Sequence, residues 1–185
     1  YPINSSMSHV IKLDYQTDPD RLKQDFDSLL EDVGFHNPNQ LTLTSVLGNN
    51  SWNESTGKIQ NLQFPEKAYC EINERLKGTY FEELINQFPD YTRWRLLKLP
   101  SHNNYSIHSD SDNGKTNIRL HIPVETNPDA YLMFFDERTE PKMYHLEVGS
   151  TYQVNTTGLH SAINFGWKDR YHIVGVKYEN SNNRT

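Results

Sequence analysis

Residues 117–135 read NIRLHIPVETNPDAYLMFF, a stretch that predicts two strands joined by a turn. In its first half apolar side chains alternate with polar ones, as in a strand that buries one face. Arg119 and His121 lie on the face opposite the apolar series. The Asn-Pro-Asp sequence at 127–129 then favours a turn, before a second β-rich run begins at Ala130.

The same kind of short β-rich run recurs through the C-terminal half of the chain. Turn signals such as Asn113-Gly114, Gly149-Ser150 and Lys168-Asp169 separate the runs. Short strands with turns every ~8–12 residues are typical of a β-sandwich or barrel, so the sequence predicts a mainly β fold. The expected strands are 91–99, 104–108, 117–125, 130–135, 143–148, 151–155, 159–165 and 171–179.

Helical spacing dominates the N-terminal half instead. Residues 18–33 predict an amphipathic helix that Asp18 or Asp20 can cap. The spacing returns in residues 66–88, which predict one or two helices broken by Gly78.

Between these helices the pattern changes twice. Residues 41–46 alternate like a strand. Residues 47–64 form a turn-rich loop, long for a compact domain, and such loops often cover functional sites. We therefore expect this loop, with its Trp52, either to cover a site or to be disordered.

Composition limits the function classes. The chain has 185 residues, a net charge of −6 and no cluster of Lys and Arg, so binding of nucleic acid has no electrostatic support. No apolar run approaches the ~20 residues that a membrane span needs. A single cysteine, Cys70, excludes an internal disulfide and favours a reducing compartment, and we expect a cytoplasmic location. Its helical context predicts a packing role for Cys70.

The sharpest candidate for chemistry is His108-Ser109-Asp110, followed far downstream by His160. Residues i and i+2 of an extended segment point the same way, so His108 and Asp110 can reach one ion. Two imidazoles and a carboxylate on one face of a metal leave open positions, which suits non-haem Fe(II) oxygenases. Asp112 is a rival carboxylate, although its neighbours favour a turn.

A second polar set accompanies this triad. Arg170 and His172 share one side of their predicted strand, as Arg119 and His121 do. Taken alone, either arginine would be interpreted as one partner of a surface ion pair. Together with the triad they indicate a polar pocket, because the planar guanidinium binds carboxylates through two hydrogen bonds.

Four stretches carry a family resemblance. They are YSIHSD at 105–110, RLHIPVETNP at 119–128, YHLEVG at 144–149, and HSAINF at 160–165 with Arg170 ten residues after the distal histidine. In order and spacing they resemble the aspartyl/asparaginyl β-hydroxylase-like branch of the 2-oxoglutarate oxygenases, and among these the bacterial proline hydroxylases. The resemblance covers about the C-terminal half of the chain.

The resemblance implies a double-stranded β-helix, or jelly-roll barrel, in residues 91–180. The length suits a single domain, 1–185, in which the helical residues 1–90 support that barrel. It implies that His108, Asp110 and His160 ligate Fe(II), and that Arg170 pairs with the distal carboxylate of 2-oxoglutarate. Arg119 would lie near the cosubstrate or the substrate carboxylate, and His121 beside the cosubstrate pocket. With dioxygen, such an enzyme hydroxylates an amino acid or a residue of a peptide or protein.

The sequence also departs from the family pattern. The usual Gly-Glu-Val-Trp is here Gly149-Ser150-Thr151-Tyr152, and Leu97 stands where related enzymes have a serine that helps hold the cosubstrate. Substrate identity therefore does not carry over. Two alternatives stay open: a jelly roll that binds a metal or a sugar without catalysis, and a cupin-type iron enzyme that does not use 2-oxoglutarate. Tyr105, Asn164 and Trp167 are candidates for the pocket walls.

Overall fold

A computed structural model of the chain describes residues 8–35, 39–110, 116–136 and 140–177. Its strands are β1 (Val10–Gln16), β2 (Gln40–Thr42), β3 (Thr44–Ser45), β4 (Glu71–Ile72), β5 (Tyr91–Leu99), β6 (Asn103–Asn104), β7 (Ile118–Glu125), β8 (Ala130–Phe134), β9 (Lys142–Tyr144), β10 (Ser150–Asn155), β11 (His160–Asn164) and β12 (Arg170–Lys177). The helices are α1 (Pro19–Asp32) and α2 (Tyr80–Gln87), with short 3₁₀ turns η1 (Ile59–Asn61), η2 (Glu66–Ala68) and η3 (Glu74–Leu76).

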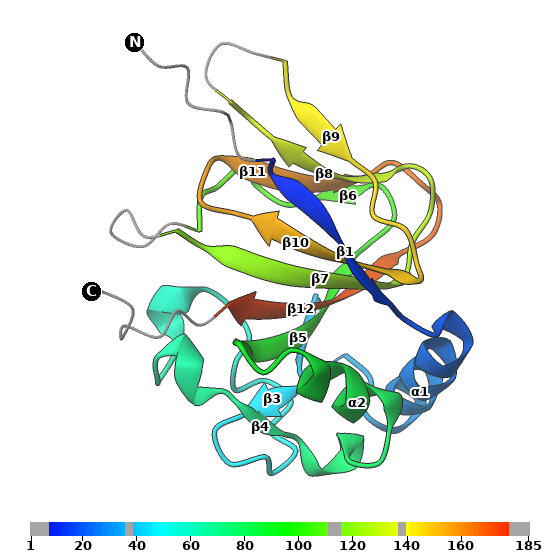
Figure 1. Cartoon of the computed structure of the whole chain (residues 1–185), viewed down its shortest axis with the longest axis vertical. Coiled ribbons are helices and arrows are strands. Elements are labelled where there is room, and N and C mark those ends of the chain that lie inside the picture. Colours follow the sequence, from blue (N-terminus) through cyan, green and yellow to red (C-terminus); the bar gives the residue numbers. More distant parts are fainter. Residues whose placement is uncertain (1–7, 36–38, 111–115, 137–139, 178–185) are drawn as a thin grey trace.

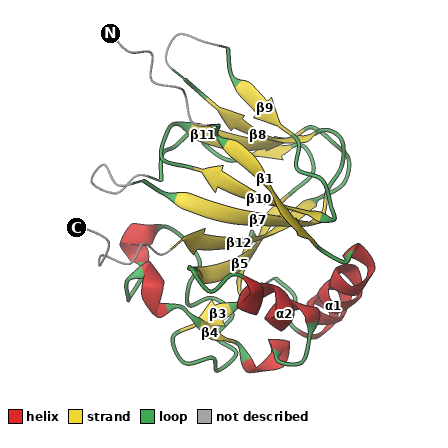
Figure 2. Ribbon diagram, viewed as in Figure 1, coloured by secondary structure: helices red, strands yellow, loops and turns green. Residues whose placement is uncertain are grey.

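Two antiparallel sheets face each other and form the predicted jelly roll (Figures 1 and 2). The larger has six strands in the order β1-β10-β7-β12-β5-β2, and the smaller has four in the order β6-β11-β8-β9. Between them lies a buried apolar cluster to which both sheets contribute, with Leu99 and Val154 from the larger and Phe134 and Ala162 from the smaller. This cluster closes part of the barrel interior and leaves the rest for a cavity.

The main core lies on the outer face of the six-stranded sheet, under the two α-helices. Leu22 and Phe26 of α1 and Leu84 of α2 pack there against Leu120 and Ile122 of β7. Alternation along β7 therefore sends its apolar residues to the helices and leaves its polar residues facing the barrel interior. The strand periodicity predicted from the sequence is confirmed.

Helix α1 begins as its sequence predicts. The carboxylate of Asp18 accepts hydrogen bonds from the backbone N–H groups of Asp20 and Arg21, both at 3.1 Å. Pro19 occupies the first helical position, where its missing N–H costs nothing. The chain leaves the helix through Gly34, whose φ of 67° suits glycine.

Of the one or two helices predicted over residues 66–88, only α2 forms, and the part before Gly78 holds two 3₁₀ turns and β4 instead of an α-helix. The backbone carbonyl of Tyr69 accepts hydrogen bonds from the Thr44 hydroxyl and from the N–H of Arg93. These tertiary bonds, with the pairing of β3 and β4, hold the segment extended. Cys70 consequently lies outside any helix and is exposed, contrary to its predicted packing role.

Several strand predictions also change in extent. The strand expected at 41–46 divides into β2 and β3. Strand β1, which pairs with β10, was not predicted although residues 11–16 alternate between apolar and polar. The strands expected at 104–108 and 143–148 shorten to β6 and β9. Asp112 and the turn expected at Asn113-Gly114 lie outside the described residues. Within the described ranges, neither α-helix is long and apolar enough to cross a membrane.

Candidate metal centre

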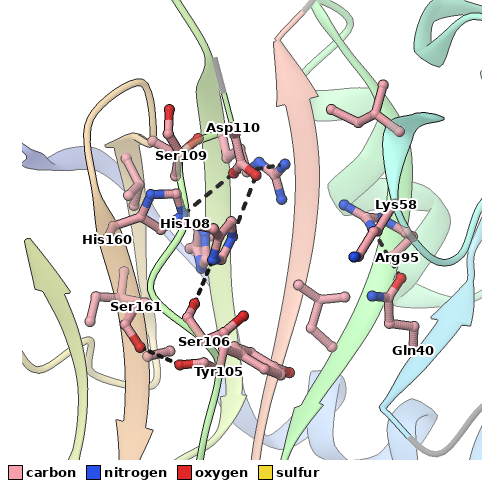
Figure 3. A pocket seen from close by; sticks show the side chains of 18 of the residues that line it. Gln40, Lys58, Arg95, Tyr105, Ser106, His108, Ser109, Asp110, His160 and Ser161 are labelled. Atoms are coloured by element: carbon pink, nitrogen blue, oxygen red, sulfur yellow. Dashed lines mark hydrogen bonds and ion pairs between the residues drawn. The ribbon is translucent and has the colours of Figure 1, made fainter. Parts of the chain in front are cut away.

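A cavity of about 550 Å³ opens into the barrel interior between the two sheets (Figure 3). This volume falls in the range of small-molecule sites. Its walls carry charged and polar groups from both sheets, together with part of the loop before η1. The strongest candidates from the sequence, His108, Asp110, His160, Arg119 and Arg170, all line it, as does His121.

Backbone pairing brings the two histidines together. His108 and His160 form an antiparallel bridge in which each N–H donates to the other's carbonyl, at 3.0 and 2.8 Å. The N–H of Asp110 donates to the Thr156 carbonyl at 3.1 Å. A segment of extended chain is therefore fastened beside β11, and this fixes where the side chains of residues 108 and 110 point.

The three side chains converge on one point. One ligand atom from each of His108, Asp110 and His160 lies within 4.8 Å of the others. The Nε2 atoms of both histidines lie 3.5 Å from oxygens of the Asp110 carboxylate (Figure 3). This spacing and this set of donors fit a divalent transition metal whose three protein ligands occupy one face of its coordination sphere.

Hydrogen bonds behind the imidazoles prepare them to act as ligands. Nδ1 of His108 lies 2.7 Å from the Ser106 carbonyl, and Nδ1 of His160 lies 2.9 Å from the Gly158 carbonyl. Because a carbonyl oxygen can only accept, each Nδ1 carries the hydrogen and each Nε2 faces Asp110. Outer hydrogen bonds of this kind orient metal-ligating histidines in proteins.

Electrostatics keep the carboxylate ionised. Burial by itself raises the pKa of Asp110, but the contacts with His108 and His160 and the charge of Arg119 outweigh it and hold that pKa well below its usual range. Nη2 of Arg119 lies 2.8 Å from Oδ2 of Asp110. The contact with Asp110 in turn raises the pKa of His108. The carboxylate is therefore ionised at the point where the three side chains meet.

Buried cations form the rest of the polar lining. Arg170 is 2% exposed, and its Nε has no hydrogen-bond partner in the described part of the chain. Arg93 and Arg95 of β5 also line the cavity, and the sequence analysis missed both. Their signal was available, because they flank Trp94 in the same polar–apolar alternation that identified Arg119 and His121.

Two histidines share a buried contact deeper in the barrel. Nδ1 of His121 lies 3.3 Å from Nδ1 of His172, and both residues are almost completely buried. Burial lowers the pKa of each imidazole, and the charge of Arg170 adds to the effect. His121 lines the cavity, whereas His172 lies behind it.

Of the three residues predicted to form pocket walls, only Tyr105 lines the cavity. Its hydroxyl donates to the Lys98 carbonyl at 2.6 Å. Asn164 instead bridges backbone carbonyls near Leu99, and Trp167 is 88% exposed; neither lines the cavity.

Part of the long loop does reach the site. Gly57, Lys58 and the start of η1 line the cavity. Trp52, by contrast, packs against the core on the helix side. The loop therefore contributes to the rim, but not through its tryptophan.

Comparisons with known proteins bear on the fold. No protein-family model matches the chain, and no curated protein matches its sequence. Among solved structures, a prolyl hydroxylase from Trichoplax adhaerens, in complex with a hypoxia inducible factor oxygen degradation domain peptide fragment, gives a TM-score of 0.56 at 10% identity over 92% of this chain and 83% of that chain.

Two further prolyl hydroxylases are similar along most of their length. A Pseudomonas putida prolyl-4-hydroxylase gives a TM-score of 0.52 at 10% identity, covering 93% of this chain and 94% of that chain. A viral collagen prolyl hydroxylase from Paramecium Bursaria Chlorella virus-1 gives 0.54 at 8% identity, covering 94% and 91%. At identities this low the structural similarity shows the shared double-stranded β-helix fold alone, so the activity must be argued from the site itself.

Proposed function

We propose that this protein is an Fe(II)- and 2-oxoglutarate-dependent dioxygenase that hydroxylates an amino acid or a residue of a peptide or protein. The observation that carries the proposal is the convergence of His108, Asp110 and His160 in a cavity that also contains the buried, partly unpartnered guanidinium of Arg170. A metal-binding module without catalysis has no need for a buried cation beside its metal.

The triad would hold the iron through the Nε2 atoms of His108 and His160 and the carboxylate of Asp110. Iron, 2-oxoglutarate and dioxygen would together supply the oxidation, with decarboxylation of 2-oxoglutarate to succinate coupled to hydroxylation of a substrate C–H bond. The protein's own part is to position these groups, supply charge and exclude water.

Arg170 would bind the distal carboxylate of 2-oxoglutarate. Its burial makes a carboxylate partner favourable, because a desolvated guanidinium with open N–H groups is costly to leave unpaired. Leu97 and Tyr105 line the same cavity and would exclude water around this pair. His121, which burial keeps neutral, would lie beside the cosubstrate without adding charge.

Arg119 would act on the metal ligand. Its contact with Asp110 leaves it as a positioning residue for the carboxylate, which differs from the role near a cosubstrate or substrate carboxylate that the family resemblance implies.

Substrate size is open between a free amino acid and a residue of a peptide. The similar Trichoplax protein was solved with a peptide fragment, which supports including peptides among the substrates tested. Product analysis with free amino acids and with peptides separates the two.

An anaerobic titration with Fe(II) and 2-oxoglutarate tests the proposal. We expect the visible metal-to-ligand charge-transfer band in the wild-type protein, and its loss in the His160→Ala variant. His102→Ala is the matched control, because His102 is exposed and does not line the cavity. No band in the wild type, or an unchanged band in His160→Ala, would rule out the proposal.

The cosubstrate site has its own test. Arg170→Gln removes the charge and should weaken 2-oxoglutarate binding by ~30-fold or more, since a buried carboxylate loses its partner. Arg75→Gln is the control, because Arg75 is a surface arginine paired with Asp32. Unchanged affinity in Arg170→Gln would show that Arg170 does not hold the cosubstrate.

A further inference from the structure

Arg95 is a buried cation that the proposed chemistry leaves unused. It is 2% exposed and lines the cavity. Its Nη1 donates to Oε1 of Gln40 at 3.0 Å, but Nε and Nη2 have no hydrogen-bond partner in the described ranges. A guanidinium has five N–H donors, and a buried donor left unsatisfied costs free energy.

The neighbouring charges do not neutralise Arg95. Arg93 pairs with Glu66, and Arg119 pairs with Asp110. Burial lowers the pKa of Arg95, and repulsion from Arg93 and Arg119 lowers it further. The environment therefore penalises this charge unless an anion accompanies it.

A second cation reaches the same place from the loop. Lys58 lines the cavity beside Arg95 and has no ion-pair partner among the described residues (Figure 3). Gln40 joins the loop to Arg95 next to Lys58, because its Oε1 accepts from both the Arg95 guanidinium and the N–H of Gly57, the latter at 2.9 Å. Arg93 also donates to the Gly57 carbonyl at 2.8 Å. The position of Lys58 is thus built into the fold.

Figure 3 shows Arg95, Lys58 and Gln40 on the wall opposite His108, Asp110 and His160. If Arg170 takes the distal carboxylate of 2-oxoglutarate, two cations remain on this wall without an anion. Cosubstrate and metal therefore do not account for the charge in the cavity.

We propose that Arg95 and Lys58 bind a carboxylate of the substrate, so that the hydroxylated compound is acidic and is held across the cavity from the metal. This inference rests on the proposed function. The carboxylate can belong to a free amino acid or to an Asp or Glu side chain of a peptide, since both present the same planar group to the guanidinium.

Succinate release tests the inference with matched probes. Free proline is compared with prolinamide, and free aspartate and glutamate with their diamides. Short peptides with blocked termini that contain Asp or Glu are compared with the same peptides containing Asn or Gln. We expect only carboxylate-bearing compounds to stimulate turnover. Stimulation by free amino acids alone, or by acidic peptides alone, identifies the source of the carboxylate; equal stimulation by acids and amides would overturn the inference.

Variants locate the site. Arg95→Met should raise KM for the stimulating acid by ~30-fold or more, and Lys58→Gln by less, because Lys58 is exposed. Arg95→Lys should recover part of the loss, and Arg75→Gln should behave as the wild type. The affinity for 2-oxoglutarate, measured from the charge-transfer band, should stay unchanged in Arg95→Met. An unchanged KM for the acid in that variant would overturn the inference.

Stability separates a binding role from a structural one. A buried charge that is paired only when a ligand is bound destabilises the ligand-free protein. The Arg95→Met variant should therefore unfold at a temperature no lower than the wild type. A clearly lower unfolding temperature would make Arg95 a structural residue and overturn the inference. Failure of the acid–amide comparison while the wild type still forms the charge-transfer band would leave the oxygenase assignment standing; absence of the band would remove both.

Discussion

The guanidinium of Arg119 contacts the carboxylate of Asp110, with Nη2 2.8 Å from Oδ2. Both side chains are largely buried, at 12% and 10% exposure, so the pair lies in a low-dielectric setting. A cation that orients a metal-ligating carboxylate acts on the metal through that carboxylate. We therefore propose different roles for Arg119 and Arg170, although both arginines line the same cavity.

The Arg119→Gln variant should bind metal more weakly, by ~10–100-fold, because such outer partners fix the position of the ligand. Calorimetric titration with Mn(II) in place of iron measures this without turnover. Arg119→Lys, which keeps the charge but loses the planar fork, should be intermediate. A loss of 2-oxoglutarate affinity with unchanged metal affinity would instead place Arg119 beside the cosubstrate.

The pair His121 and His172 predicts sensitivity to acid. Burial lowers both pKa values in the folded protein, whereas an unfolded histidine titrates near ~6.5. Below that pH the unfolded chain binds more protons than the folded one. The free energy of unfolding therefore keeps its full contribution from these histidines above pH ~6.5. It falls as the pH drops, by up to about 1.4 kcal/mol per pH unit for each histidine.

Urea unfolding at pH 7.5 and pH 5.5 measures this loss. His172→Gln should show a smaller difference between the two pH values than the wild type, because one titrating group is gone. His102→Gln, which alters an exposed histidine, is the control. An equal pH dependence in His172→Gln and the wild type would contradict the prediction that His172 contributes to the loss of stability in acid.

Gly175 in β12 leaves room for the ring of Trp94. A Cβ at position 175 would lie 2.8 Å from Cε2 of that ring. Gly175→Ala should therefore destabilise the protein by about 1–3 kcal/mol, as overpacking of a core does. Gly158→Ala is the control, since a Cβ there meets nothing within 4 Å. Equal unfolding free energies for the two variants would show that the ring can move aside.

Arg93 fastens the loop that forms the rim of the cavity. Besides its pair with Glu66, its guanidinium donates to the carbonyls of Ser55 and Gly57, at 3.0 and 2.8 Å. Arg93→Met should free this loop and speed trypsin cleavage after Lys58, measured by mass spectrometry under native conditions. Arg21→Met, which removes an exposed ion pair with Glu83, should leave the cleavage rate unchanged.

The sequence predicted the β half of the molecule better than the rest. Alternation is a strong signal where a strand separates two environments, as in β7, whose apolar face meets the helices and whose polar face meets the cavity. The convergence of His108, Asp110 and His160 followed from the motif order, and their ligand atoms do lie together.

Where the sequence misled, tertiary bonds decided the structure. Tyr69 and Leu76 are buried at helical spacing, but Tyr69 directly follows the 3₁₀ turn η2 and Leu76 ends the 3₁₀ turn η3. Periodicity cannot distinguish these cases, because it reports which residues are buried and not how the backbone pairs. Arg93 and Arg95 were missed for a different reason: a single alternating strand reveals a polar face without showing that it encloses a cavity.

Strand β1 is an edge strand of the six-stranded sheet, where it pairs with β10. Its backbone groups occupy donors and acceptors that β10 would otherwise offer to another polypeptide. A shortened chain beginning at residue 18 would therefore make β10 the edge strand in place of the irregular β1, with its backbone donors and acceptors open to another molecule although every residue around the cavity was retained.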